Sequence, residues 1–217
     1  MGQEGWVLLG YASAETVYMA GIATLLAILC GLPLGIFLFL SRPQQLLAQA
    51  VVHHSLSFLV TVGRSIPFLI LMIAMIPVTR WVVGTSIGTN AAIVPLAVAA
   101  IPFFARLVDS ALLEVQYGVI EAALAMGATT AQIIFKVLLP EARLSLIQGV
   151  TLTAITLIGY SAMAGAVGGG GLGDLAVRYG YQRFNTAVML ETMAILVVLV
   201  QWTQMAGNGA RRYYDRS

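Results

Sequence analysis

Two ionisable side chains stand inside long apolar stretches of this sequence. Arg64 lies about halfway through one apolar run, and Glu191 is the only charge in another. A charge at the centre of a bilayer costs roughly 3 kcal/mol or more, so both residues are functional candidates. Pro67 frees a carbonyl near Gly63, which the guanidinium can satisfy. Arg64 can instead pair with Glu191 or with a ligand carboxylate, and Glu191 can face a watery cavity.

A polar stripe follows one face of a later apolar run. Thr153, Thr156, Tyr160 and Met163 recur at spacings of three and four, which places them on one side of a helix. Such a stripe suits a pathway for a small zwitterion if two copies meet at a dimer axis, and it also suits hydrogen bonding between packed helices. The candidate pathway residues are Arg64, Ser65, Thr153, Thr156, Tyr160, Ser161, Met163 and Glu191.

The sequence contains no nucleotide-binding motif in the structural context that such a motif requires. Gly168, Gly170 and Gly173 satisfy G-x-G-x-x-G, but they follow an apolar helix and not a strand. We expect them to let the backbone bend before an outer hairpin that ends near Tyr181. The only lysine, Lys136, follows no glycine-rich stretch, so the chain has no Walker A loop. We therefore expect no catalytic residue, no metal ligand and no cofactor on this chain.

The elements that carry these residues are predicted to be membrane helices. Of 217 residues, 59% are hydrophobic and 9% are charged, where a soluble domain has about 25% charged residues. A spanning helix needs about 20 consecutive apolar residues, and the runs do not alternate as the strands of a barrel do. In the first run, Gly31 and Gly35 indicate close helix packing. We expect an all-α membrane protein with five transmembrane helices, at about residues 16–40, 51–76, 91–108, 144–173 and 186–205.

The basic residues favour an external N-terminus and a cytoplasmic C-terminus. The first 41 residues contain neither Lys nor Arg, which excludes a secretory signal peptide. Five spans place the termini on opposite sides, and this orientation gives seven basic residues inside and three outside. The net charge of +2 thus reflects topology and indicates no nucleic-acid partner. The inner residues are Arg42, Arg106, Lys136, Arg143, Arg211, Arg212 and Arg216, and the outer ones are Arg80, Arg178 and Arg183.

The longest inner connection predicts a helix, a sharp turn and a second helix. Helix formers fill residues 119–126, and Gly127 stands where a left-handed residue closes a helix. Thr129 and Gln132 have capping-box spacing, and Pro140 ends the second helix or opens the next one. The first helix is apolar around most of its circumference and therefore needs a partner surface. Lying on lipid is the alternative, but the basic and Trp flanks that this requires are missing.

This connection resembles the cytoplasmic loop of permease subunits of bacterial ATP-binding-cassette importers. The family pattern Glu-Ala-Ala, three residues, Gly, nine residues, Ile-x-Leu-Pro stands here as 121–123, Gly127 and 137–140, with Val137 in place of Ile. In that family the short helix docks into a groove on the ATPase subunit and transmits its closure to the membrane helices. The resemblance implies that the coupling residues are Val119, Ile120, Glu121, Ala122, Ala123, Leu124, Met126, Gly127, Leu139 and Pro140.

Residues 63–68, 83–88 and 159–163 make the chain most similar to methionine-importer permeases. The resemblance implies a type I importer permease domain at 13–207, a short external segment at 1–12 and a cytoplasmic basic tail at 208–217. It also implies a bacterial cytoplasmic (inner) membrane location and import of D- or L-methionine.

The resemblance also implies a non-enzymatic subunit that works with several partners. These are a second copy of itself, two ATPase subunits that bind ATP and Mg, an extracytoplasmic substrate-binding protein and the lipid bilayer. The outer loops are too short to form a capture domain, and five helices are few to enclose a pathway. A permease for another small polar solute and an ion-coupled secondary transporter remain alternatives.

Overall fold

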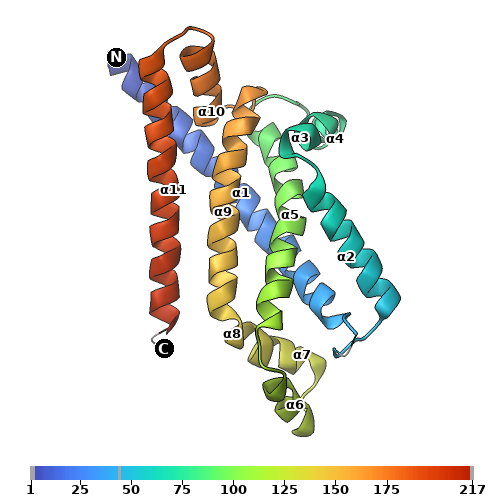
Figure 1. Cartoon of the computed structure of the whole chain (residues 1–217). Helices are drawn as coiled ribbons and strands as arrows, with labels where there is room; N and C mark the ends of the chain where they lie inside the picture. Colours follow the sequence, from blue (N-terminus) through green and yellow to red (C-terminus); the bar gives the residue numbers. More distant parts are fainter. Residues whose placement is uncertain (1–2, 44, 216–217) are drawn as a thin grey trace.

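The computed structural model describes residues 3–43 and 45–215, and every regular element within these ranges is helical (Figure 1). Four helices, α1, α5, α9 and α11, are long and apolar enough to cross a membrane, and the bent pair α2–α3 makes a possible fifth span. The predicted all-α membrane architecture is thus confirmed with four to five spans. The elements are α1 (Gln3–Leu40), α2 (Ala50–Ser65), α3 (Phe68–Ala74), α4 (Ile76–Val83), α5 (Thr89–Leu113), α6 (Tyr117–Ala125), α7 (Thr130–Ile133), the π-helix η1 (Ile134–Leu138), α8 (Leu139–Glu141), α9 (Arg143–Ala166), α10 (Gly171–Leu175), the π-helix η2 (Ala176–Tyr181) and α11 (Thr186–Asp215).

The second apolar run is broken where a single helix was expected from residue 51 to 76. Ile66 is extended, with φ −77° and ψ 122°, because Pro67 disfavours helical backbone in the residue before it. The helix axis bends by 98° between α2 and α3. The 16 residues of α2 span about 24 Å at 1.5 Å per residue, less than the roughly 30 Å of a bilayer core. The second span is therefore a short helix followed by a sharp bend.

α1 crosses the back of the bundle diagonally and packs on α5 (Figure 1). A Cβ atom at Gly31 would lie 2.9 Å from the carbonyl oxygen of Ile101, and one at Gly35 would lie 2.5 Å from that of Ala105. Only glycine allows this approach, so the close packing predicted for Gly31 and Gly35 is confirmed. The main hydrophobic core lies along this contact and includes Met19, Ala27, Phe39, Leu96, Phe104 and Leu112.

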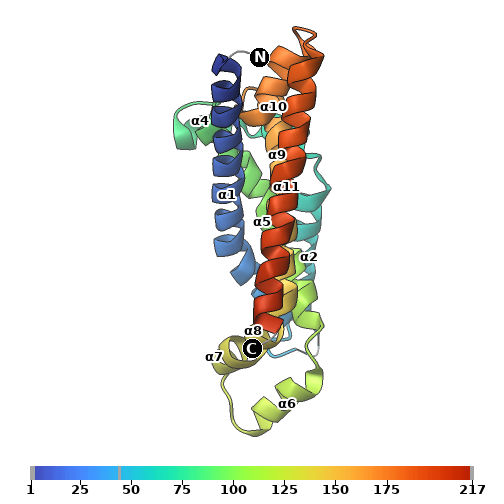
Figure 2. The same cartoon turned by 90° about the vertical axis from the view of Figure 1, so that its left-hand side faces the viewer.

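The two ends of the bundle differ, and we call them upper and lower after their place in Figure 1. The N-terminus and α10 lie at the upper end, whereas the C-terminus and α6 to α8 lie at the lower end (Figures 1 and 2). Between α9 and α10, Gly168, Gly170 and Gly171 have φ values of 87°, 81° and 74°. These left-handed residues turn the chain into the hairpin that ends at Tyr181, as predicted for Gly168 and Gly170, whereas Gly173 lies within α10 and takes no part in the turn.

The upper part of α1 is hydrogen-bonded to the upper hairpin through Glu15 and Thr16. The Glu15 carboxylate accepts a hydrogen bond of 2.7 Å from the Gly171 N–H, and the Thr16 hydroxyl accepts one of 2.9 Å from the Leu172 N–H. Residues 3–12, which we expected as a separate external segment, continue α1 as helix. Residues 208–215 of the expected basic tail likewise continue α11, and Arg216 lies outside the described residues.

Candidate functional site

A Schellman motif closes α6 at Gly127. Gly127 has φ +80°, its N–H donates to the Leu124 carbonyl at 2.9 Å, and the Ala128 N–H donates to the Ala123 carbonyl at 3.0 Å. These two bonds satisfy carbonyls that a helix end otherwise leaves free. A Cβ atom at Gly127 would meet no atom within 4 Å. The left-handed conformation predicted from sequence is confirmed, and it alone explains the need for glycine here.

The next helix begins with the predicted capping box. The Gln132 N–H donates to the Thr129 hydroxyl at 3.4 Å, and the Thr129 N–H donates to the Gln132 side chain at 2.8 Å. α7 then continues through η1, where the Leu139 N–H reaches back to the Ile134 carbonyl, into α8. Pro140 stands in the first turn of α8, directly after η1, and has no N–H to donate to the preceding turn. The predicted helix, turn and helix are therefore present.

α6 buries only a narrow edge of its surface. Ile120 and Ala123 are 2% and 4% exposed and belong to the core that includes Ile133 and Leu138. The remainder faces outward beyond the lower ends of the long helices (Figure 2). This arrangement leaves a mostly apolar surface that no other described residue of the chain covers. The exposed residues of α6 and its C-cap are Tyr117, Gly118, Val119, Glu121, Ala122, Leu124, Ala125 and Met126, of which Met126 is 81% exposed.

A cavity of about 170 Å³ brings Arg64 and Tyr160 together between α2, α3, α5 and α9. The Arg64 guanidinium carbon lies 5.6 Å from the Phe103 ring centroid. Phe68 stacks on Tyr160 with the ring centroids 4.6 Å apart and the planes inclined by 6°. A guanidinium can bind a carboxylate, and aromatic rings favour a thioether at their edges. The cavity thus combines groups that complement both ends of a small thioether-bearing amino acid.

The structure corrects the proposed partners of Arg64. α2 and α11 lie on opposite sides of the bundle (Figure 1), so the hypothesis of an Arg64–Glu191 pair is wrong. Within the described residues Arg64 donates to no carbonyl and forms no ion pair, so it does not satisfy the carbonyl near Gly63. Oε2 of Glu191 is buried and has no hydrogen-bond partner among the described residues.

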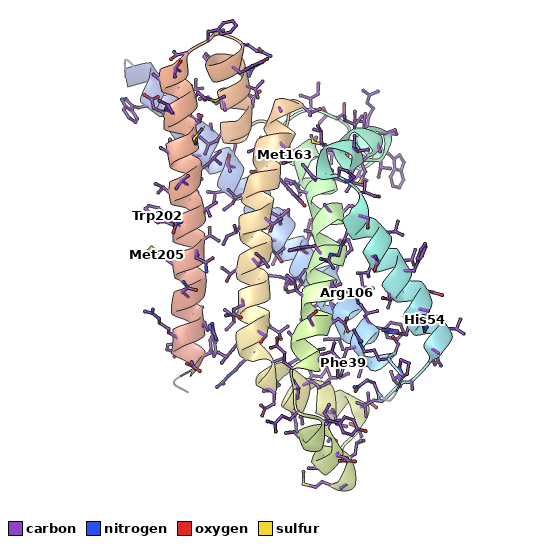
Figure 3. All side chains as sticks on the ribbon, viewed as in Figure 1. Phe39, His54, Arg106, Met163, Trp202 and Met205 are labelled. Atoms are coloured by element: carbon purple, nitrogen blue, oxygen red, sulfur yellow. The ribbon has the colours of Figure 1, made fainter. Side chains whose placement is uncertain are left out.

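The other residues of the predicted stripe are dispersed. Thr153 and Ser161 are buried, and their hydroxyls donate to carbonyls of α9 itself. The Thr156 hydroxyl also donates within α9, but its side chain is only half-buried. Met163 is 50% exposed near the upper end of α9 (Figure 3). The open face of α9 therefore carries Thr156, Tyr160 and Met163, and not Thr153 or Ser161.

Ser65 on α2 is exposed, and its hydroxyl donates to the carbonyl of Thr61.

Sequence reasoning missed a buried ion cluster at the lower end. Asp109 on α5 is 1% exposed and binds Arg42, from the loop after α1, and Arg106, one turn earlier on α5. The hydrogen bond to Asp109 raises the pKa of Arg42. The sequence did contain a signal for this cluster. Asp109 follows Arg106 by three residues, at the end of an apolar run in a chain with few charges. The cluster ties the loop between α1 and α2 to α5.

Comparison with known proteins identifies the family of this chain. The family described as binding-protein-dependent transport system inner membrane component matches residues 23–216. The chain belongs to this family. It is therefore a multi-pass inner-membrane protein and the permease subunit of an ATP-binding-cassette importer, in which the ATPase is a separate subunit. The alternative of an ion-coupled secondary transporter is set aside.

Individual relatives of this permease have a narrower description. The probable D-methionine transport system permease protein MetI of Vibrio cholerae is 52% identical over 208 residues, which are 96% of this chain and 92% of that protein. The protein of the same description from Pasteurella multocida is 50% identical over 97% of both chains. A chain of the MetNI methionine ABC transporter in inward-facing conformations is 48% identical, with a TM-score of 0.97 over 99% of both chains.

Proposed function

We propose that this permease imports methionine, as D- or L-enantiomer, through a homodimer driven by two ATPase subunits. The observation that supports this most is the uncovered apolar surface of α6 at the lower end of a chain so similar to one from MetNI. The ATPase subunits bind ATP and Mg, and this chain binds no cofactor. An extracytoplasmic binding protein delivers the substrate to the short upper loops, residues 77–90 and 168–183.

In this proposal the lower end is cytoplasmic and the N-terminus is external. Five of the seven basic residues assigned to the inside lie in four segments: the loop after α1, η1, the start of α9 and the last turns of α11. They are Arg42, Lys136, Arg143, Arg211 and Arg212. These segments accompany α6 and the C-terminus at the lower end (Figure 1). The positive-inside rule therefore supports the assignment. The permease domain is residues 13–207, preceded by an external extension of α1 and followed by a cytoplasmic extension of α11.

Two sites divide the work. The exposed residues between Val119 and Met126 dock on the ATPase. Ile120 and Ala123 hold α6 on the core. The turn and the helix that follow are fixed by Gly127, Leu139 and Pro140. In the membrane, Arg64 binds the substrate carboxylate and Tyr160, with Phe68, contacts the thioether. Thr156 and Met163 on the same face of α9 extend this pathway toward the upper end. The matched MetNI structure supports treating this conformation as inward-facing.

The test is reconstitution with purified components. A tagged chain should retain one ATPase subunit per permease copy after gentle solubilisation. Proteoliposomes with permease, ATPase and binding protein should take up labelled methionine only when ATP is supplied. Competition by other small amino acids identifies the substrate. Absence of a co-purified ATPase would refute the coupling assignment, and ATP-driven uptake of a different solute only would refute methionine as the substrate.

A further inference from the structure

A second cavity, of about 490 Å³, opens between α1, α9 and α11 in the lower half of the bundle. Its lining is aliphatic apart from Phe104 and two threonines. The hydroxyls of Thr151 and Thr203 donate to carbonyls of their own helices at 2.8 and 2.9 Å. No polar group of the lining therefore needs water. We call this cavity the lower groove.

The lower groove exists because small residues line one face of α11. A Cβ atom at Gly207 would lie 2.1 Å from Oγ1 of Thr151, so α9 and α11 touch at this point. Ala206 and Ala210, on either side of Gly207, have side chains too short to fill the space. Trp202 and Met205 project from α11 away from α9 (Figure 3), and each is 68% exposed. An empty groove of this size forfeits dispersion contacts along its whole wall, so an apolar occupant is favoured.

Two arginines stand at the lower mouth of the groove. Arg143 precedes the lining residues Leu146 and Ile147 by three and four positions on α9. Arg211 follows Gly207 by four positions on α11. Helical residues at these spacings share a face. Both arginines are exposed, and neither forms an ion pair within the part of the chain that the structure describes.

Carboxylates complete this rim. Arg211 lines a neighbouring polar cavity of about 450 Å³ together with Glu114 and Glu141. Glu114 accepts a hydrogen bond from Ser145 on α9, and Glu141 is exposed. The rim therefore offers guanidinium groups for a phosphate and, beside them, carboxylates for an ammonium group. A headgroup with net negative charge would meet repulsion from both glutamates.

We propose that the lower groove is a binding site for a phospholipid with an amine-bearing headgroup, such as phosphatidylethanolamine. One acyl chain fills the groove, the phosphate binds Arg143 and Arg211, and the ammonium binds Glu114 or Glu141. Basic residues at the membrane surface commonly bind phospholipid headgroups between transmembrane helices. A helix from another protein would fill the groove only by burying both arginines, which is costly unless it also brings anions. The lipid site is independent of the substrate assignment.

Lipid retention tests this proposal directly. The permease with its ATPase is purified in mild detergent, and bound lipids are quantified by native mass spectrometry. We expect bound phosphatidylethanolamine, with at least fivefold less in a groove-filling variant, Ala206→Leu with Ala210→Leu, and in the variant Arg143→Gln with Arg211→Gln. The matched controls are Ala187→Leu with Ala194→Leu, on exposed positions of α11 away from the groove, and Arg212→Gln. These controls should retain the wild-type amount.

A second measurement covers variants that fold poorly. Phosphatidylethanolamine added to delipidated wild-type protein should raise its melting temperature, and the arginine variant should show no such shift. Equal retention and equal shifts in all variants would overturn the site. Preferential retention of phosphatidylglycerol would overturn the headgroup assignment. A disulfide-linked dimer of the Ala206→Cys chain, made in a Cys30→Ser background, would show that a second copy covers the groove and would also overturn the proposal.

Discussion

The guanidinium of Arg42 binds both oxygens of the Asp109 carboxylate, with Nε 3.0 Å from Oδ1 and Nη2 2.7 Å from Oδ2, although 67 residues separate them in the chain. Arg106 adds one bond of 3.1 Å to Oδ2. A bidentate pair fixes both position and orientation. The loop after α1 therefore has a defined place against α5, and α2 starts from a fixed point.

Arg42→Ala should destabilise the protein more than Arg106→Ala, because it removes two bonds to a buried carboxylate and leaves only one. We expect losses of about 3 and about 1 kcal/mol, respectively. Thermal unfolding in detergent measures both, with the exposed Arg212→Ala as the control. Equal losses for the two variants would contradict the role given to the bidentate pair.

The stabilisation from the Arg42–Asp109 pair should depend little on pH in the neutral range. The pKa of Arg42 is raised above the ordinary arginine value, so the stabilisation from its charge is complete below that ordinary value and is lost only as pH rises through the higher folded-state value. The arginine therefore stays charged between about pH 6 and pH 9. Arg42→Lys keeps a positive charge but loses the bidentate geometry of the guanidinium. The difference in unfolding free energy between wild type and this variant should therefore stay constant as the pH is raised across this range.

Substitutions at Gly127 separate backbone conformation from contact. Because the site is open, Gly127→Val suffers only from its left-handed backbone, at about 1–2 kcal/mol, while Gly127→Asn tolerates that conformation. We expect both variants to reach the membrane at near-normal levels. Gly127→Val should lose ATPase association or ATP-coupled uptake, and Gly127→Asn should keep most of it. Normal uptake by the valine variant would remove this turn from the coupling mechanism.

Arg64 variants test the membrane cavity. Arg64→Gln removes the charge that we assign to the substrate carboxylate, and a charge-assisted bond is worth about 1.5–3 kcal/mol, or roughly a tenfold to hundredfold loss in apparent affinity. Tyr160→Ala should weaken methionine uptake through lost stacking with Phe68. Ser65→Ala is the control, because the hydroxyl donates within α2. The measurement is the concentration dependence of methionine uptake, and an unchanged KM for Arg64→Gln would exclude substrate contact.

Packing of α1 on α5 should be sensitive to a single methyl group. Gly35→Ala brings Cβ to 2.5 Å from the Ala105 carbonyl oxygen and 2.6 Å from Cβ of Val108, so the helices must separate at about 1–3 kcal/mol. Gly21→Ala meets no atom within 4 Å and is the matched control on the same helix. Yield and melting temperature in detergent compare the two. Equal stability would mean that α1 can shift on α5 without loss.

Local signals predicted local structure well. The Schellman turn at Gly127 and the capping box at Thr129 depend on neighbours in the chain, so their residue types were sufficient. The break at Ile66 was signalled by Pro67, but hydropathy continues across it and gives no information about the direction of the chain. Hydropathy also placed residues 3–12 outside the membrane helix, whereas contacts with α10 extend α1 through them.

Relations between distant segments were not predictable from one sequence. A pair between Arg64 and Glu191 was one of the alternatives because both are charges in apolar runs, yet their helices lie on opposite sides of the bundle. The same limit hid Asp109, whose partner Arg42 is on another segment. The stripe on α9 had the correct period, but period alone could not show that Thr153 faces the core while Tyr160 faces Phe68.

The bonds from Glu15 and Thr16 to α10 also bear on the order of biosynthesis. These residues belong to the first helix made, and their donors at Gly171 and Leu172 are synthesised 156 residues later. Until α10 leaves the ribosome, the Glu15 carboxylate has no protein donor and must stay hydrated at the membrane surface. A nascent chain that stops before Gly171 therefore lacks both donors and cannot complete the upper end of the bundle.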